Sequence, residues 1–483
     1  MILNGFNNKH YLAFPILLAL LSGGCTPAQN RDISGDLTLG KTFSSDELFQ
    51  EDSAVSAATA NQAYAGKNGW WTLYEDETLN TLMQSAFQDN PDLNQTRARL
   101  AQTAALAKKS ASAFWPQATI TGSRETVNGD TASPSDVSLT GAASFEFDLW
   151  GKNRATFKAS DLQTQASAET LKAATITLSA SIVENWLQIL AAREEEALVR
   201  KQLDINTTIL DLQTRRFSLG TATALDVLQQ KEALVRSQSL LPEIHARQNE
   251  LKNNVSVLIG RSPTTHTFEV TSSKLPAPLP LPHNGVPSSL LASRPDIIAA
   301  WLELQASDWA TQAAIADRLP NFTLFATYTT TATALDALLN TWLLNMAADI
   351  AIPIIDGGNR RAEVWHKQAL ADERYHAYRE TILNAVADVE NALSKNHYQN
   401  KELVALNDEL EAARNTLEQA QISYINGNQS YINVLTSLNN VYKLEQQIVQ
   451  EHLNLNLYRV ALYRALGGQS WVNSAALKKR EAA

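Results

Sequence analysis

The residues best able to do chemistry are few and widely separated. Cys25 is the only cysteine, so the chain has neither a disulfide framework nor a cysteine-rich metal site. The eight histidines lack the paired spacing that a zinc site uses. Gly35–Thr42 matches the phosphate-binding pattern GxxxxGK[ST], but a polar stretch precedes it where that site needs a buried strand. We therefore expect no ATP site, no metal site and no cofactor.

Enzymatic activity and nucleic-acid binding are not indicated. The sequence contains no GxSxG nucleophile motif, and we interpret Glu194–Glu196 as a solvated helical face. The formal net charge of −10 supplies no surplus of cations to neutralise phosphates. With 483 residues, of which 44% are hydrophobic, the chain is long enough for two or three folded domains.

The N-terminus predicts export and lipid attachment. An apolar run, Tyr11–Leu21, is too short to span a bilayer as a helix, which takes about twenty residues, but it fits the core of a signal peptide. The following residues resemble a bacterial lipoprotein box with Cys25 as the acylated residue, although Ser22 stands where Leu is usual. Thr26, rather than Asp, would direct such a lipoprotein to the outer membrane. Acylation would tether the chain to the membrane; the alternative is a plain secretory signal.

The rest of the chain contains two copies of one unit. Asn90-Pro91-Asp92 recurs as Arg294-Pro295-Asp296, and Phe217-Ser218-Leu219-Gly220 recurs as Tyr424-Ile425-Asn426-Gly427. Self-similarity at a nearly constant offset indicates a tandem duplication. We therefore predict a signal peptide (1–24), an N-terminal anchor or linker (25–65), a first repeat (66–275), a Pro-rich linker (276–287), a second repeat (288–470) and a C-terminal tail (471–483).

Each copy predicts the same order of elements. A helix, roughly 92–114 or 296–318, is followed by two runs of alternating apolar and polar residues, which fit strands with one face in lipid and one in water. The predicted strands are about 117–127, 137–147, 321–331 and 345–354.

Long helices follow each strand pair. No Pro or Gly interrupts 153–218 or 359–426, so each helix could extend on the order of 100 Å. Leucine and other apolar residues recur every seven positions, which indicates coiled-coil packing: Leu203, Leu210 and Phe217 in the first copy, and Leu403, Leu410, Leu417, Tyr424, Val434, Val441, Ile448 and Leu455 in the second. Gly220 and Gly427 predict the turns that reverse the chain, and Pro242 predicts a kink or break in the helix after the first turn.

Four lipid-facing strands cannot close a membrane barrel, whose smallest forms have eight. The chain is therefore expected to oligomerise, and the coiled coils that continue from its strands are expected to form a tube. The predicted fold class is mainly α with a transmembrane β portion: a long coiled-coil α-barrel, four strands per chain and two tandem structural repeats.

Between Trp70 and Gly468 the chain contains, in this order, Trp70-Trp71, Asn90-Pro91-Asp92-Leu93, Phe145–Gly151, Arg294-Pro295-Asp296-Ile297 and Pro353–Gly358. In these segments the sequence resembles the TolC-like outer-membrane efflux factor family, specifically its NodT-type lipoprotein branch. The resemblance implies a homotrimer whose twelve strands close one outer-membrane β-barrel above a periplasmic α-barrel. It also implies partners: a periplasmic adaptor (membrane fusion) protein and an inner-membrane efflux pump, usually proton-driven. The expected function is the exit duct of this tripartite system, which passes small toxic compounds or drugs.

The resemblance also implies where the channel closes and where the adaptor docks, namely at the two turns. The residues concerned are Leu219, Gly220, Asp226, Tyr424, Gly427, Gln429, Asn433 and Thr436. The family's closing contact often joins a tyrosine at the position of Tyr424 to an acid at that of Asp226. A basic residue often found in this latch is replaced by Gln429, and acids that often ring the aperture are replaced by Asn433 and Thr436. We therefore expect no strongly cation-attracting constriction.

Other interpretations remain open at this point, both for Tyr424 and Asp226 and for the whole chain. Tyr424 could be a heptad core residue, and Asp226 could be an acid at a helix N-terminus, where the helix dipole favours it. The chain could instead be the outlet of a type I protein secretion system. It could also be an envelope coiled-coil lipoprotein without a pore, which would retain the coils but would not need the alternating strands.

Overall fold

The computed structural model describes residues 69–468, except 126–135, 267, 269, 271, 273, 282–293, 334–336 and 339. These residues belong to two compact units. The strand unit contains Ala98–Glu169 and Ile298–Glu380, and the turn unit contains the described parts of Leu39–Arg97, Thr170–Ile297 and Thr381–Ala483. Cys25 and the Gly35–Thr42 pattern lie outside the described residues.

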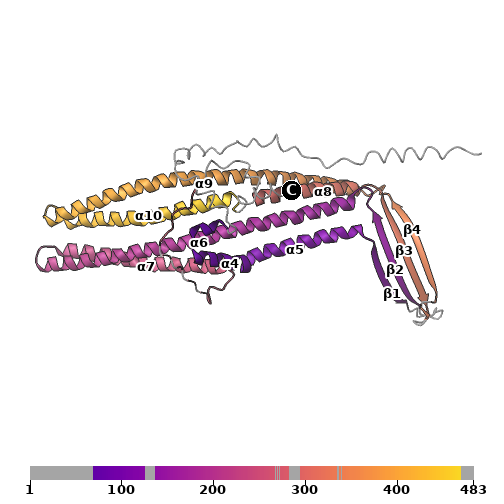
Figure 1. The fold of residues 1–483 in the computed structure, drawn as a ribbon, viewed down its shortest axis with the longest axis horizontal. Helices are drawn as coiled ribbons and strands as arrows, with labels where there is room; N and C mark the ends of the chain where they lie inside the picture. The colour runs from indigo at the N-terminus through magenta and orange to yellow at the C-terminus, as the bar shows by residue number, and fades with distance from the viewer. Residues whose placement is uncertain are drawn as a thin grey trace, which may run out of the picture. The chain divides into compact units, whose positions relative to one another are not determined.

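Most of the described chain is helical (Figure 1). The helices are α4 (Glu77–Asp89), α5 (Pro91–Ala111), α6 (Lys152–Ser218), α7 (Ala224–Leu258), α8 (Pro295–Ala316), α9 (Asn359–Ile425) and α10 (Tyr431–Ala465), with 3-10 turns η1 (Trp70–Tyr74) and η2 (Ser112–Phe114). The duplication is visible in their lengths, because α6 and α9 each have 67 residues and α7 and α10 each have 35. None of the helices described carries an apolar run of the length that a bilayer crossing requires.

Pro242 does not break the helix, contrary to the sequence prediction. It lies inside α7, which runs without interruption from Ala224 to Leu258. A proline at this position deprives the carbonyl of Gln238 of its helical donor. Both Pro242 and Gln238 are exposed, so water can bind the freed carbonyl and the cost of the missing bond is small.

The strand unit contains one antiparallel sheet in the order β1-β2-β3-β4 (Figure 1). Its strands are β1 (Gln117–Glu125), β2 (Asp136–Phe147), β3 (Asn321–Ala332) and β4 (Trp342–Ala351). β4 begins and ends three residues earlier than the pattern predicted. Pro353 has no N–H to donate to a ladder, so the alternation that continues through Ile352 and Ile354 is not part of the strand.

The register gives the sheet one apolar and one polar face. Residues directly opposite one another in an antiparallel pair project from the same side, and Leu139 pairs with Thr330, Phe145 with Leu324, and Leu324 with Ala348. The apolar face consists mainly of Ala118, Ile120, Val137, Leu139, Ala143, Phe145, Phe147, Phe322, Leu324, Ala326, Tyr328, Trp342, Leu344, Met346, Ala348 and Ile350, and it also carries Gly122, Arg124, Gly141, Thr330 and Ala332. The opposite face is rich in Thr and Ser: Thr119, Thr121, Ser123, Ser138, Thr140, Ser144, Thr323, Thr327, Thr329 and Thr331.

The main core of the turn unit surrounds Trp186 of α6, which is 2% exposed. The two repeats make equivalent contacts at its edge. The side-chain amide of Asn90 donates to the carbonyl of Leu258 at 2.8 Å, and the guanidinium of Arg294 donates to the carbonyl of Ala465, also at 2.8 Å. Each residue thus fastens the start of one helix to the last turn of another helix of its own repeat.

Part of the Pro-rich linker is bound to the turn unit. The backbone N–H of Leu275, the residue just before the linker, donates to Glu194 at 2.9 Å. On α10, Asn456 donates to the carbonyl of Pro276 at 3.2 Å, and Arg459 donates to that of Leu279 at 2.5 Å. The linker is therefore held along one face of α10 over this stretch.

The three consecutive glutamates are not a simple solvated face, which corrects the sequence interpretation. Glu194 accepts a hydrogen bond from the N–H of Leu275, next to the linker, and Glu195 forms an ion pair with Arg247 of α7. Glu196 accepts hydrogen bonds from Gln248 at 2.9 Å and His245 at 3.1 Å. The solvated-face interpretation failed because α7 and the linker pack beside this turn of α6.

Candidate functional site

The candidate site is the end of the turn unit where α6 reverses into α7 and α9 reverses into α10. Both helices end in the same way. The N–H of Gly220 donates to the carbonyl of Phe217 and that of Thr221 to Arg216, and Gly427 and Asn428 repeat this pattern with Tyr424 and Ser423. The glycines have φ of 73° and 75°, the left-handed region that this C-terminal cap requires. The two turns predicted from sequence lie where expected.

The starts of the following helices differ. Thr223 and Asp226 form a capping box at the start of α7, in which the N–H of Thr223 donates to the Asp226 carboxylate at 2.8 Å and the N–H of Asp226 donates to the Thr223 hydroxyl at 3.2 Å. The corresponding residue in the second repeat, Asn433, has no such box, and its side-chain amide donates to Gln429 at 3.1 Å. Thr436 donates to the carbonyl of Ile432 within α10.

Tyr424 is half-buried and fixed by three contacts within the protomer. Its hydroxyl donates to the side-chain carbonyl of Gln213 on α6 at 3.1 Å. The guanidinium of Arg216 lies 4.6 Å from the centre of its ring, a cation–π distance, and the Tyr431 ring lies 5.4 Å away. Tyr424 therefore ties the second repeat to α6 of the first.

A second tie between the repeats is fully buried. The hydroxyl of Tyr431 on α10 donates to the side-chain carbonyl of Gln230 on α7, and the amide of Gln230 donates to the backbone carbonyl of Asn206 on α6 at 2.9 Å. Asn206 in turn donates to Ser237 at 3.0 Å. Burial above all, with nearby Tyr424 and Asp226, raises the pKa of Tyr431, so this hydroxyl stays a neutral donor at physiological pH.

The sequence prediction located the turns but not these buried amides. Gln213 and Gln230 are 2% and 0% exposed, whereas Phe217, which the heptad pattern assigned to the core, is 49% exposed. The signal was present as a polar stripe at coiled-coil spacing on α6: Gln202, Asn206 and Gln213. A count of apolar residues alone overlooks such a stripe.

The expected contact between Tyr424 and Asp226 is not formed within one protomer. Among the described residues, Tyr424 bonds to Gln213 and Asp226 caps α7, and no hydrogen bond joins the two. Large apolar side chains are nevertheless exposed at this end, including Leu219 at 78% and Ile425 at 71%. Such a cluster is typical of a surface that another chain covers.

Comparisons with known proteins agree with this architecture. A family model described as outer membrane efflux protein matches residues 82–261 and 286–468. The chain is 30% identical over 415 residues to the pyoverdine export outer membrane protein OpmQ of Pseudomonas aeruginosa, covering 83% of this chain and 87% of that protein. It is 25% identical over 468 residues to the cation efflux system protein CusC of Escherichia coli, covering 94% and 98%. The solved outer-membrane channel OprN superposes with a TM-score of 0.77 at 26% identity, covering 86% of this chain and 96% of that one.

Proposed function

Because the chain belongs to the outer membrane efflux protein family, we propose that three copies of it join their sheets to close one channel through the outer membrane. Members of this family are outer-membrane channels rather than enzymes, and this chain is an outer-membrane efflux channel with the fold of its solved relatives. What we propose beyond this is how many copies assemble, how the channel is closed, what it carries and how it is anchored.

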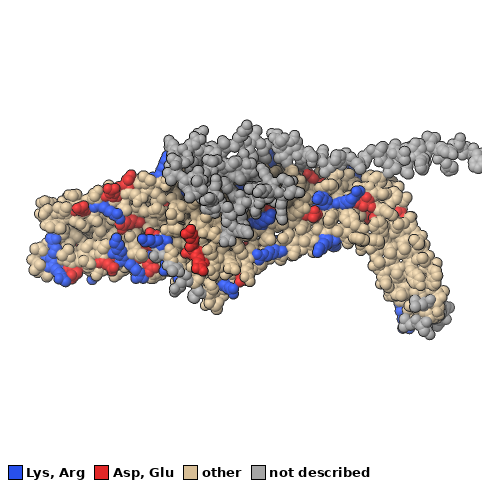
Figure 2. All heavy atoms as spheres, in the orientation of Figure 1, with Lys and Arg blue, Asp and Glu red and all other residues tan. Residues whose placement is uncertain are grey.

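The two-faced sheet is the observation that carries the proposal. Its apolar face suits contact with lipid and its Thr- and Ser-rich face suits a water-filled lumen. Figure 2 shows few charged side chains on the part of the surface formed by the strands. Within the described residues, β1 and β4 each pair on one side only. Unpaired backbone groups are costly in lipid, so these edges must pair with neighbouring copies.

Three copies are the number that supports closure best. Two copies would supply eight strands, the size of barrels whose interiors are filled by side chains, whereas three supply twelve and leave an open lumen. The same three-fold arrangement would surround a tunnel with the coiled-coil helices. We also propose that the chain divides into two repeats, 66–275 and 288–470, which the Pro-rich linker joins.

We place the closing end of the tunnel at the two turns. The ties from Tyr424 to Gln213 and from Tyr431 to Gln230 hold the helical hairpins of one protomer together, and Asp226 stabilises the start of α7. The exposed apolar residues beside the turns, such as Leu219 and Ile425, suit neighbouring protomers and a periplasmic adaptor. The lack of acids at Asn433 and Thr436 favours a constriction without strong cation selectivity.

The cargo class is small organic compounds or drugs, delivered by a proton-driven inner-membrane pump through an adaptor. The similar proteins differ in the cargo that their names record, pyoverdine for OpmQ and cations for CusC. A duct that receives its cargo from a pump needs no binding pocket for it. Selection therefore belongs to the pump.

Conductance tests the closing role of the turns. Asp226→Ala with Tyr424→Ala removes the cap of α7 and the hydroxyl tie to Gln213, and we expect the purified channel to spend more time open in planar bilayers. Tyr398→Ala, at an exposed position of α9, is the control. Unchanged open time in the double variant would refute the proposed gate.

We also propose that Cys25 carries the lipid anchor. In cells grown with labelled palmitate, Cys25→Ser should abolish labelling of the chain while other lipoproteins remain labelled. Persistent labelling of the variant would refute the assignment of the lipid anchor to Cys25.

A further inference from the structure

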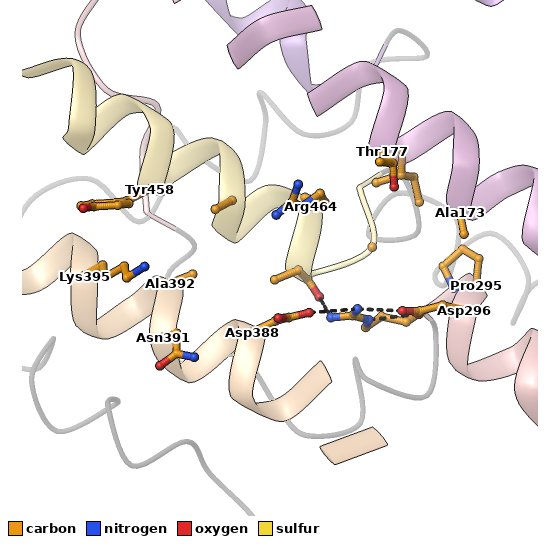
Figure 3. Close-up of a pocket in the computed structure, with 15 residues that line it drawn as sticks. Ala173, Thr177, Pro295, Asp296, Asp388, Asn391, Ala392, Lys395, Tyr458 and Arg464 are labelled. Carbon is orange, nitrogen blue, oxygen red and sulfur yellow. Dashed lines mark hydrogen bonds and ion pairs between the residues drawn. The ribbon is translucent and has the colours of Figure 1, made fainter. Parts of the chain in front are cut away.

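A polar cavity in the turn unit has no part in the proposed channel function. Its volume is about 410 Å³, which is in the range of small-ligand sites. It is lined by α6, the start of α8, and facing stretches of α9 and α10 (Figure 3). Small residues in the lining leave the space open: Ala173, Ala392, Ala461, Ala465 and Gly467.

The acidic residues that line this cavity are engaged by one arginine. Arg294, whose side chain is 11% exposed, donates to both carboxylate oxygens of Asp296, at 3.1 Å and 2.7 Å. Its guanidinium also lies 3.5 Å from the carboxylate of Asp388. The dashed lines at Asp296 and Asp388 in Figure 3 mark these interactions. Burial opposes its charge, but these hydrogen bonds outweigh burial and raise the pKa of Arg294.

Two further cations, both exposed, line the cavity. The ammonium of Lys395 on α9 lies 5.3 Å from the centre of the Tyr458 ring on α10, and within the described part of the chain it makes no ion pair. Arg464, also on α10, approaches Glu184 no closer than 3.9 Å. Burial raises the pKa of Glu184, and the charge of Arg464 opposes this shift.

The lining therefore contains three cations and two acids. Arg294 engages both acids, so the positive surplus belongs to Lys395 and Arg464. The Tyr458 ring lies against the Lys395 ammonium and restricts it, so less conformational entropy is lost when a ligand binds. Anionic oxygens bind ammonium and guanidinium groups through charge-assisted hydrogen bonds. The adjoining volume has room for the rest of a small molecule.

We propose that this cavity is a binding site for a small anion, whose carboxylate or phosphate group binds between Lys395 and Arg464. Occupation would bridge α9 and α10 and so stabilise the folded turn unit. None of the residues that line this site belongs to the two turns.

The test uses the full chain purified in detergent, with inorganic phosphate and acetate as probes and chloride at matched ionic strength as reference. We expect phosphate, acetate or both to raise the melting temperature above the chloride value in a saturable way. Removing one cation should weaken apparent affinity on the order of tenfold. Lys395→Met with Arg464→Met should abolish the effect, and the charge-preserving Lys395→Arg with Arg464→Lys should retain part of it.

A matched control separates site binding from a general charge effect. Lys401→Met with Lys443→Met removes two exposed cations from the same helices outside the cavity lining, and should leave the response intact. No stabilisation by either probe, or equal loss in the control and cavity variants, would overturn the proposal. The conductance of the cavity variants, which should match that of the unaltered channel, keeps this result distinct from a failure of the channel function.

Discussion

Two buried tyrosine hydroxyl groups on α10, about three helical turns apart, differ in their hydrogen bonding. Tyr431 donates its hydroxyl to buried Gln230, whereas the buried hydroxyl of Tyr442 has no hydrogen-bond partner among the described residues. Removing a buried donor leaves its acceptor without a hydrogen bond, whereas removing an unpaired hydroxyl leaves no group unsatisfied. The two tyrosines therefore form a matched pair for mutation.

Tyr431→Phe should lower the free energy of unfolding by about 1–2 kcal/mol, because the Gln230 carbonyl would lose its donor. Tyr442→Phe should be neutral or slightly stabilising. Chemical denaturation of the detergent-solubilised protein measures both. Equal effects of the two substitutions would show that the Tyr431 tie contributes no stability.

Individual residues also mark the limits of sequence reasoning at the site. The turns at Gly220 and Gly427 were predictable because a left-handed cap has a strong glycine preference. The partners of Tyr424 and Asp226 were not, because they depend on which helices lie side by side. The family resemblance suggested a Tyr424–Asp226 contact, but within one protomer each side chain has another partner.

At the scale of elements, the lateral packing of α6 against α7 depends on Glu196. Its carboxylate is partly desolvated, but hydrogen bonds from Gln248, His245 and Arg200 outweigh this and lower its pKa to about 2. A carboxyl group with a lowered pKa in the folded state stabilises the protein above its unfolded pKa of about 4.5. That contribution is lost as pH falls from about 4.5 towards 2.

Glu196→Gln should therefore destabilise the protein at neutral pH by about 1–3 kcal/mol and much less near pH 3. Melting temperatures of the variant and the unaltered protein at pH 7, 5, 4 and 3 give the comparison. Glu402→Gln, a charge loss at an exposed position on α9, is the control. A difference that stays constant across this range would contradict the role of the ionised carboxylate.

The sequence predicted the boundaries of helices and strands correctly where the hydrophobic periodicity agreed with the positions of Pro and Gly. The two strand pairs and the uninterrupted helices α6 and α9 were predicted because alternation and the absence of Pro and Gly are local signals. The end of β4 was misplaced because apolar alternation continues past Pro353, and Pro242 was misjudged because its exposure is not visible in sequence. The docked linker could not be foreseen, since long-range contacts with α6 and α10 hold it.

At the scale of the whole molecule, one chain supplies an incomplete wall. Its four strands have one face suited to lipid, one suited to water, and two unpaired edges. Those edges require strands of neighbouring copies to pair with. The duplication explains how one chain comes to contribute two strand pairs and two helical hairpins. Amphipathic alternation predicted this arrangement from sequence, because it follows from lipid and water on opposite sides of the sheet.

The most direct test of the account is the single-channel conductance, in planar bilayers, of the detergent-purified protein fraction whose measured mass is that of three chains. We predict that this fraction exists and gives discrete conductance steps of one size, with long closed intervals. A protein that remains monomeric, or a three-chain fraction without discrete steps, would contradict the claim that three copies close one outer-membrane channel.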